Sequence, residues 1–586
     1  MSWEDNFPLS KFYDDLYSSK KGAYEEAKHV FIKGNSLKEK FRNLKAEENF
    51  SIVEIGFGVG INFLATCEEW LNESKSKKPL QYIAFDKALF SLKQFEKAIG
   101  HYPNLKNFSN EYIKEYPYNI AGTQRISLFE NRISLTLILD DIQTSLSYLK
   151  NASDIDAWYL DGFSPDKNPD MWSEEIFRQL YRASHKDSTF STYASARLVK
   201  DNIENANLTY KIAEGFANKR HMLKGTVKTN KTKELIKQKK VAIIGSGIAG
   251  STLAYTLAER GHKVDLYEQD EEICSRASGN GVLITYPRLS AFDSPYARFC
   301  IHSFLFASSF YDRLKTIAWN RCGVLLLNHD DSSLKRQTSL LNARSDDKLF
   351  EALSCEEASK KANLKLNNGG MFFKKGGFIE PKILCQSLLT HKNINQILST
   401  KIEKLDSDGI NHKIVTDGKV IEYEEVCLCA GHTSKELIDL NGLSSKRGQI
   451  SYVDSSNDFE NLKFPICGSG YFSPKVNGTH IVGSSYSDIK NGDIDEEEHK
   501  SNIEKLKTIH SFAVNIVSGK VGFRAVTKDR MPLVGVKNGI YVNTGHGSRG
   551  STSSPLCAEI IADLIDEKPL PVDDGIANAL DLNRFN

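Results

Sequence analysis

The sequence lacks the features that mark membrane, secreted and metal-binding proteins. No apolar run approaches the length of a membrane span. The ten cysteines are scattered, with no Cys-x-x-Cys pair and no Cys/His cluster at zinc spacing, so we expect no metal site. The first residues are acidic and have no signal-peptide core. Together these absences predict a protein of the reducing cytoplasm, with no membrane partner.

An excess of charge of one sign is also missing. The 76 basic and 75 acidic residues give a net charge of +1, so any nucleic-acid surface must be a local patch. Neither an internal repeat nor a long low-complexity tract is present. The remaining composition, with 40% hydrophobic and 26% charged residues, is that of an ordinary globular protein. A length of 586 residues suits two or three domains better than a single core.

Two glycine-rich loops of different kinds are the most informative feature of the chain. The first is residues 54–62, Glu-Ile-Gly-Phe-Gly-Val-Gly-Ile-Asn, and the second is residues 243–250, Ile-Ile-Gly-Ser-Gly-Ile-Ala-Gly. Each follows an apolar strand-like run and precedes a helix-like one. Glycine serves where the backbone must approach a ligand closely. The two loops therefore predict two separate cofactor sites and two catalysts fused in one chain.

The N-terminal half predicts a doubly wound parallel sheet, because strand and helix signals alternate along it. Acidic residues follow successive strands: Asp86 follows 81–85, Asp141 lies just after 134–139, and Asp161 follows 157–160. Each acid alone is more often a helix cap or a turn residue. Several at the carboxyl ends of strands favour a ligand site, since open α/β sheets bind ligands at that edge.

This pattern resembles a class I S-adenosylmethionine-dependent methyltransferase. The resemblance implies that the glycine loop cradles the methionine part of the donor and that the acids bind its ribose and base. Residues 161–165, Asp-Gly-Phe-Ser-Pro, resemble the acceptor loop of amino-group methyltransferases. An amine must be neutral to attack a sulfonium methyl, which makes Asp161 the candidate catalytic group. The donor-binding residues implied are Glu54, Gly56, Gly58, Gly60, Asn62, Asp86 and Asp141.

The C-terminal half begins with a dinucleotide-binding pattern. Gly245, Gly247 and Gly250 form a Gly-x-Gly-x-x-Gly turn between a strand-like and a helix-like run, and Glu268 ends the next strand at the expected spacing. The pyrophosphate would lie at the helix N-terminus and Glu268 would bind the adenosine ribose. An acid at that position disfavours a 2′-phosphate and therefore NADP.

Later motifs favour FAD over NAD by resemblance. Residues 426–431 resemble the second nucleotide-side strand and turn of flavoproteins, and 276–281 lie where such proteins place a loop along the isoalloxazine. Residues 522–535 and 545–550 resemble the closing motifs of the D-amino-acid oxidase and glycine oxidase group, which implies an α/β domain with an antiparallel substrate-binding sheet. Beyond the glycine turn and Glu268, the FAD contacts implied are Ser278, Gly279, Asn280, Gly431, Gly547, Ser548 and Gly550.

The same resemblance assigns the substrate carboxylate to arginines. Arg524 and Arg549 are the candidates, because a guanidinium binds a carboxylate with two parallel hydrogen bonds. One of the two could instead be a structural ion-pair partner. His546 is interpreted as a packed group, since flavin-dependent amine oxidation needs no strong protein base.

Longer segments resemble one bifunctional family. Residues 159–172, 191–196 and 215–223 are similar to the methyltransferase domain of the tRNA 5-methylaminomethyl-2-thiouridine biosynthesis proteins, and 14–17 and 30–35 are similar to its N-terminal segment. The resemblance covers essentially the whole chain. It implies FAD-dependent removal of the carboxymethyl group from carboxymethylaminomethyl-(2-thio)uridine, followed by S-adenosylmethionine-dependent N-methylation. The tRNA substrate follows from this resemblance alone, with the wobble base splayed out to enter a pocket.

Phe163, Pro165, Lys219 and Arg220 are the implied substrate contacts. Lys219 and Arg220 could contact tRNA phosphates, or they could equally be a solvated pair at a strand end. The expected domains are a methyltransferase at 1–227, a lysine-rich linker at 228–239 and an oxidoreductase at 240–586, in a monomer. The linker is interpreted as solvated, with a basic strip for RNA phosphates as a second interpretation.

Two other functions remain open at this stage. One is a small-molecule glycine- or sarcosine-type oxidase fused to an amine methyltransferase. The other is an RNA-binding flavoprotein whose oxidase half is inert.

Overall fold

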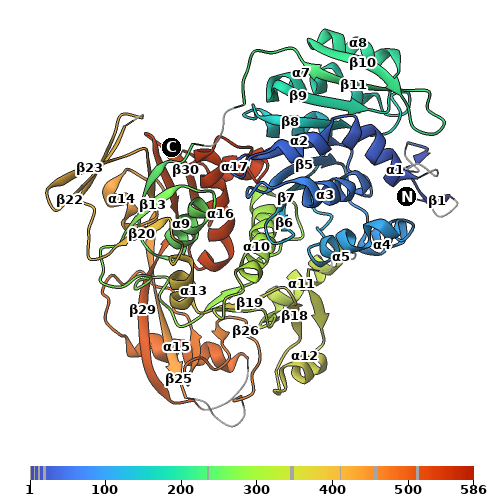
Figure 1. Ribbon diagram of the computed structural model, residues 1–586. Helices are drawn as coiled ribbons and strands as arrows, with labels where there is room; N and C mark the ends of the chain where they lie inside the picture. Colours follow the sequence, from blue (N-terminus) through green and yellow to red (C-terminus); the bar gives the residue numbers. More distant parts are fainter. Residues whose placement is uncertain are drawn as a thin grey trace. The chain divides into compact units, whose positions relative to one another are not determined.

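The chain divides into two compact units (Figure 1). The computed structural model describes residues 2–4, 7–10, 13–16, 22–233, 237–343, 349–409, 411–454, 459–509 and 514–586. The first unit comprises Met1–Lys237 with Asp566–Asp574, and the second comprises Gln238–Ile565 with Gly575–Asn586. The short segment 566–574 thus belongs with the first unit, whereas the sequence analysis places it in the oxidoreductase domain.

The first unit is built on an eight-stranded sheet in the order β10-β11-β9-β8-β4-β5-β7-β6. Its strands are β4 (Phe50–Ile55), β5 (Leu80–Asp86), β6 (Gly122–Leu128), β7 (Ile133–Leu139), β8 (Ile155–Leu160), β9 (Ser184–Thr192), β10 (Leu208–Glu214) and β11 (His221–Val227). Five neighbouring strands, from β9 through β8, β4 and β5 to β7, run parallel. The chain passes from β4 outward to β5 and later returns to β8 on the other side of β4. This reversal creates the crevice in which α/β sheets bind ligands.

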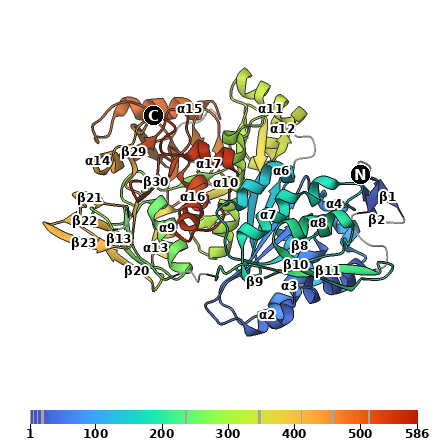
Figure 2. The same cartoon turned by 90° about the horizontal axis from the view of Figure 1, so that it is seen from above.

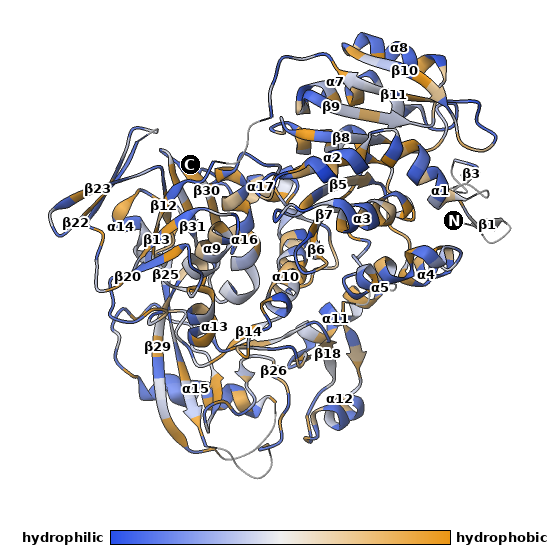
Figure 3. Cartoon of the chain, viewed as in Figure 1, coloured by the Kyte–Doolittle hydropathy of each residue, from blue (hydrophilic) through white to orange (hydrophobic). Residues whose placement is uncertain are grey.

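Helices cover both faces of this sheet, as the buried residues of β4 show. Ile52 belongs to one hydrophobic cluster and Val53 to another, because successive side chains of a strand point to opposite faces. Figure 3 shows hydrophilic and hydrophobic residues on the same helices, as expected when one side of a helix faces a sheet. The helices are α1 (Ala23–Glu26), η1 (Ala27–Lys33), α2 (Leu37–Asn43), α3 (Ile61–Glu73), α4 (Leu92–Ile99), η2 (Pro103–Leu105), α5 (Lys106–Lys114), α6 (Ile142–Ser145), η3 (Leu146–Leu149), η4 (Pro169–Trp172), α7 (Glu174–Ala183) and α8 (Arg197–Asn205). A small sheet of β1 (Ser2–Glu4), β2 (Phe7–Ser10) and β3 (Asp15–Leu16) precedes them.

The second unit contains a six-stranded sheet in the order β20-β13-β12-β24-β31-β30. Its strands are β12 (Lys240–Ile244), β13 (Lys263–Tyr267), β20 (Ile394–Ile397), β24 (Glu425–Leu428), β30 (Leu533–Lys537) and β31 (Ile540–Thr544). Neighbouring strands are parallel except β30 with β31. Helices α9 (Ile248–Glu259) and α16 (Gly550–Ile565) lie side by side in both views (Figures 1 and 2).

A largely antiparallel sheet forms the other part of this unit, in the order β17-β18-β16-β26-β27-β28-β25-β29. Its strands are β16 (Val324–Leu327), β17 (Glu351–Leu353), β18 (Gly370–Phe373), β25 (Ser444–Val453), β26 (Ile466–Cys467), β27 (Tyr471–Phe472), β28 (His480–Gly483) and β29 (Ile516–Val526). The smaller strands are β14 (Leu283–Thr285), β15 (Trp319–Asn320), β19 (Gly377–Ile379), β21 (Lys404–Ser407), β22 (His412–Thr416) and β23 (Lys419–Tyr423). The helices are α10 (Pro295–Leu314), α11 (Asp331–Ala343), α12 (Cys355–Ala362), α13 (Pro381–Leu388), η5 (Gly431–Thr433), α14 (Ser434–Leu437), α15 (Glu496–Lys507) and α17 (Asp574–Leu580). The predicted fold class is confirmed for both halves of the chain.

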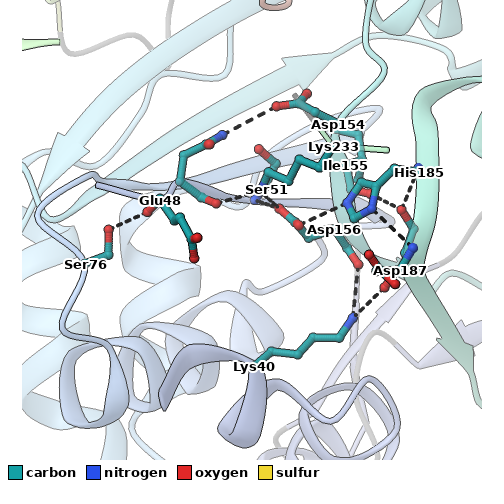
Figure 4. A network of polar contacts seen from close by, with 12 residues as sticks. Lys40, Glu48, Ser51, Ser76, Asp154, Ile155, Asp156, His185, Asp187 and Lys233 are labelled. Atoms are coloured by element: carbon teal, nitrogen blue, oxygen red, sulfur yellow. Dashed lines mark hydrogen bonds and ion pairs between the residues drawn. The ribbon is translucent and has the colours of Figure 1, made fainter. Parts of the chain in front are cut away.

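A buried polar network lies at the amino ends of β4 and β8 (Figure 4). The Asp156 carboxylate accepts hydrogen bonds from the Ser51 N–H (2.8 Å) and from Lys233 Nζ (2.7 Å), and it lies 3.1 Å from His185 Nε2. The interpretation of residues 228–239 as a solvated linker is wrong for Lys233, whose side chain is only 16% exposed. Nearby, Lys568 of the segment 566–574 pairs with Asp154. These contacts anchor both segments to the first unit.

Replacing Lys233 with methionine should destabilise the first unit by about 3 kcal/mol at neutral pH, because it leaves a buried carboxylate poorly compensated. Burial alone would raise the pKa of Asp156, but His185 and Lys233 outweigh it and hold that pKa below its ordinary value. A carboxylate whose pKa is lowered by folding stabilises the folded state at pH values above its unfolded-state pKa. This stabilisation is lost as the pH falls through the folded-state pKa, so the stability deficit of the variant should shrink below about pH 4.

Denaturant unfolding followed by tryptophan fluorescence would measure this deficit. Four of the five tryptophans, at positions 3, 70, 158 and 172, lie in the first unit. Lys231→Met is the matched control, since Lys231 is exposed and its ammonium donates to the Arg182 carbonyl. Equal stability of the two variants at neutral pH would show that the buried pair contributes nothing.

Two candidate cofactor and substrate sites

A cavity of about 630 Å³ opens at the carboxyl ends of the parallel strands of the first unit. The glycine loop between β4 and α3 forms part of its wall. Gly56 has φ +93°, and a Cβ there would lie 2.7 Å from the Asp161 carbonyl oxygen. The residue must therefore be glycine for both conformational and steric reasons. Gly60 ends the loop without lining the cavity, and it serves the turn into α3.

Asp86, the last residue of β5, and Asp141, two residues after β7, both line this cavity. Asp86 is tied to the glycine loop, because its Oδ2 accepts from the Gly58 N–H at 2.7 Å. Asp141 caps helix α6 through the Gln143 N–H (2.9 Å) and pairs with Lys87 at 2.9 Å. It therefore has the ordinary role of a helix cap as well as a place in the wall.

Glu54 lies beneath the cavity rather than in its wall. Its side chain is fully buried and accepts hydrogen bonds from Asn62 Nδ2 (2.8 Å) and from the Tyr82 hydroxyl (2.9 Å). Glu54 does not line the cavity, and the direct cofactor contact predicted for it stays a prediction. Glu54 fixes Asn62, which does line the cavity.

Asp161 directly follows β8 and lines the cavity. Its carboxylate accepts from Asn62 Nδ2 (2.8 Å) and from the Gly162 N–H (2.9 Å). Burial raises the pKa of Asp161 to about 6 despite these hydrogen bonds. The carboxylate is therefore mostly ionised at neutral pH.

The predicted substrate contacts separate in space. Phe163 lines the cavity with its ring 4.7 Å from that of Tyr13, and Lys219 lines it as well. Pro165 and Arg220 do not line it, and Arg220 is exposed. The wall also contains residues that the sequence analysis did not select: Tyr13, Asp15, Glu26 and Tyr193.

A second cavity, of about 1300 Å³, lies within the second unit between the loop after β12 and the antiparallel sheet. Gly245 has φ +104°, and a Cβ there would lie 2.7 Å from the Cys429 carbonyl oxygen. Gly250 faces this loop rather than the cavity, since a Cβ on it would lie 1.8 Å from the Gly245 carbonyl oxygen. The third glycine thus allows α9 to pack closely on the turn.

Glu268 at the end of β13 lines the same cavity. Its Oε2 accepts from the Ser246 N–H (2.9 Å) and from Ser246 Oγ (2.6 Å). Ser278 Oγ accepts from the Ile248 N–H (3.1 Å) at the start of α9. The other predicted contacts that line the cavity are Gly247, Asn280, Gly431, Gly547, Ser548 and Gly550; Gly279 does not line it. This arrangement of glycines, acid and helix N-terminus fits a flavin dinucleotide.

Arg524 and Arg549 both line this cavity, and among the residues that the structure describes neither forms an ion pair. Arg524 donates to Ser484 Oγ at 2.7 Å and to two carbonyl oxygens. Arg549 donates to the Tyr286 carbonyl at 2.9 Å and lies over the Tyr286 ring, 4.7 Å from its centroid. Two half-buried guanidinium groups that form no ion pair within the described ranges are suited to a carboxylate ligand.

His546 has both ring nitrogens engaged. Nδ1 lies 2.8 Å from Ser553 Oγ and Nε2 lies 3.0 Å from Asn543 Oδ1. Burial lowers its pKa to about 4, so the imidazole is neutral at physiological pH.

Comparison with known proteins follows this division into two sites. Residues 240–564 match the family described as FAD dependent oxidoreductase, and residues 103–228 match that of S-adenosyl-L-methionine-dependent methyltransferases. The "tRNA 5-methylaminomethyl-2-thiouridine biosynthesis bifunctional protein" of Marinomonas sp. (strain MWYL1) is 32% identical, with 100% of this chain and 97% of that protein covered. The protein of the same name from Methylobacillus flagellatus is 30% identical over 100% and 95%. The chain belongs to this family.

Solved structures show the fold of the second unit. Glycine oxidase from Geobacillus kaustophilus is similar with a TM-score of 0.53 and 20% identity, over 59% of this chain and 99% of that one. L-proline dehydrogenase from P. horikoshii is similar with a TM-score of 0.51 and 16% identity, over 60% and 98%. The tRNA 5-methylaminomethyl-2-thiouridine biosynthesis family member is thus an enzyme that uses FAD in one domain and S-adenosylmethionine in the other.

The described ranges contain no helix that is both long and apolar enough to cross a membrane. In the same part of the chain, no group of three or more His, Cys, Asp and Glu side chains could hold a metal ion.

Replacing Gly250 with alanine should reduce the flavin retained on purification about tenfold or more, equal to about 1.4 kcal/mol of binding, since its Cβ would push α9 away from the turn. The absorbance of bound flavin per protein measures this effect. Gly492→Ala is the control, because nothing lies within 4 Å of a Cβ at that position. Binding of S-adenosylmethionine should be unchanged in both variants. Full flavin content in Gly250→Ala would contradict the proposed position of the dinucleotide.

Proposed function

We propose that this enzyme removes the carboxymethyl group from carboxymethylaminomethyl-(2-thio)uridine at the wobble position of tRNA and then methylates the exposed amine. The relatives named for this pathway cover the whole chain and support the assignment. The assignment rests on the presence of two cavities in one polypeptide, each suited to one of the two steps. One presents the Arg524 and Arg549 guanidinium groups, which form no ion pair with the described residues, and the other presents the Asp161 carboxylate, whose pKa burial raises to about 6.

The oxidative step follows from the chemistry of the substrate, which is an N-substituted glycine. We propose that Arg524 and Arg549 hold its carboxylate and so direct the glycine carbon toward the dinucleotide. FAD, when bound, accepts a hydride from that carbon. Water then adds to the resulting carbon–nitrogen double bond, releasing glyoxylate and a primary amine. Neutral His546, with both nitrogens engaged, takes no proton in this step.

The methylation step uses the primary amine that oxidation produces. Asp161 accepts a proton from its ammonium form, and the free electron pair of nitrogen attacks the sulfonium methyl. A nitrogen–carbon bond forms while the carbon–sulfur bond breaks, leaving S-adenosylhomocysteine. The glycine loop, Asn62, Asp86 and Asp141 hold the donor so that the reacting atoms lie in line.

We also propose that the enzyme works as a monomer in the cytoplasm. Each unit contains its own complete cavity, so neither site requires a second copy. All ten cysteines are free thiols, which agrees with a reducing compartment.

Anaerobic reduction of the flavin tests the substrate assignment. Hypomodified tRNA carrying the carboxymethylaminomethyl group should bleach the flavin rapidly, whereas free glycine and sarcosine should do so only slowly. Turnover of the small amines at rates rivalling tRNA would support the small-molecule alternative instead. Failure of the modified tRNA to reduce the flavin would indicate an inert oxidase half.

A further inference from the structure

We propose that Glu26 and the ring of Tyr193 form the binding site for the substrate ammonium beside Asp161, and that the Lys219 ammonium competes with the substrate for this site. The inference deepens the proposed methylation of a primary amine and rests on it. It assigns Glu26 and Tyr193 a role in the methyltransferase site, and it replaces the phosphate contact expected of Lys219.

The positions of three side chains carry the inference. Lys219 Nζ lies 3.1 Å from Glu26 Oε1 and 3.4 Å from the centroid of the Tyr193 ring. All three residues line the same cavity as Asp161. A carboxylate and an aromatic face at these distances are a recognised arrangement for a cation. The lysine headgroup is a primary ammonium on a flexible stem, which is the same chemical group as the aminomethyl arm of the substrate.

The receiving groups are held by contacts within the fold, whereas the lysine side chain is more exposed. The Tyr193 hydroxyl donates to the Gly162 carbonyl at 2.5 Å, directly beside Asp161, and its ring packs edge-on against Trp172. Glu26 is the last residue of α1 and its side chain is 15% exposed. Lys219 lies in the turn between β10 and β11 and is 43% exposed. Its half-exposed ion pair is worth about 1 kcal/mol or less, so a substrate amine could displace it at low cost.

The charged residues that line the methyltransferase cavity would distinguish aminomethyluridine from its carboxymethylated precursor. Asp15, Glu26 and Asp161 line this cavity and give it an anionic character, which Lys219 opposes. An aminomethyl arm brings only a positive charge and is attracted. The unprocessed arm also brings a carboxylate, which these acids repel. Glu26 would thus help to ensure that methylation follows oxidation.

Steady-state methylation of purified tRNA bearing aminomethyluridine, with saturating S-adenosylmethionine, tests the proposal through opposite effects. Glu26→Gln should lower kcat/KM about 10- to 100-fold, because a charge-assisted contact to the amine is lost. Tyr193→Leu should also lower kcat/KM, whereas Tyr193→Phe should retain most of the activity. Lys219→Met should instead raise kcat/KM, by up to about fivefold, since it removes the competing cation.

A purely structural Glu26–Lys219 ion pair gives a different result. The kcat/KM values of Glu26→Gln and Lys219→Met would then both decrease, and that outcome overturns the proposal. Wild-type activity in Glu26→Gln would overturn it too. Glu25→Gln, at the exposed neighbouring position, is the matched control and should behave as the wild type. Unchanged affinity for S-adenosylmethionine would show that each variant is folded. If the wild-type protein does not methylate the tRNA, the proposed function fails rather than this inference.

Discussion

Replacing Asp161 with asparagine is expected to abolish methyl transfer and leave the oxidative step intact, so that tRNA accumulates aminomethyluridine. The amide keeps the size of the side chain but cannot take the proton that the ammonium must lose. The loss should be about 10² to 10⁴ in rate, the usual contribution of a general base. Single-turnover methylation of aminomethyl tRNA measures it directly.

The pH dependence provides a second readout of the same residue. Burial raises the pKa of Asp161 to about 6, so the carboxylate is ionised above that pH and protonated below it. Wild-type methylation should therefore decline as the pH falls through about 6. Asp166→Asn is the matched control, because this exposed neighbour does not line the cavity and should keep the wild-type profile. Normal methylation by Asp161→Asn would remove Asp161 from the reaction.

Replacing Arg549 with methionine should block flavin reduction by the carboxymethylaminomethyl tRNA and spare methylation. Methionine fills part of the volume over Tyr286 but offers no donor to the carboxylate. Losing one charge-assisted partner of a buried carboxylate costs about 2–5 kcal/mol, which corresponds to a rate loss of roughly 30- to 4000-fold. Arg549→Lys should also be impaired, since an ammonium cannot make two parallel hydrogen bonds.

Anaerobic stopped-flow spectroscopy at matched flavin content measures the Arg549 effect and separates it from loss of cofactor. Arg336→Met on the exposed face of α11 is the control. The assignment of two independent sites predicts that Asp161→Asn and Arg549→Met each lose one step only. If either folded variant lost both steps, the two sites would not be independent.

The glycine loops were the part of each site that the sequence could predict. Gly56 and Gly245 follow buried strands, and at both positions the backbone of another strand end leaves no room for a Cβ. The acids after β5, β7 and β8 were predictable for a related reason, because parallel strands bring their carboxyl ends to one edge. Local pattern and sheet topology thus determine these positions together.

The remaining features depend on contacts between distant segments, which no local pattern encodes. Glu26 and Tyr193 meet Lys219 only after α1, the end of β9 and the turn before β11 have converged on one cavity. Glu54 looks like a ligand in the sequence, yet its strand position buries it beneath Asn62. The lysine-rich composition of residues 228–239 predicts that Lys233 is solvated, but its ammonium donates to the buried Asp156 carboxylate at the amino end of β8.

Mass spectrometry of wobble nucleosides tests most directly whether the two sites act in sequence on one base. Hypomodified tRNA is incubated with the wild-type enzyme, with and without S-adenosylmethionine. We predict that aminomethyl-(2-thio)uridine accumulates without the donor and that methylaminomethyl-(2-thio)uridine forms with it. Recovery of unchanged carboxymethylaminomethyl-(2-thio)uridine in both samples, from protein that holds its flavin, would contradict the account.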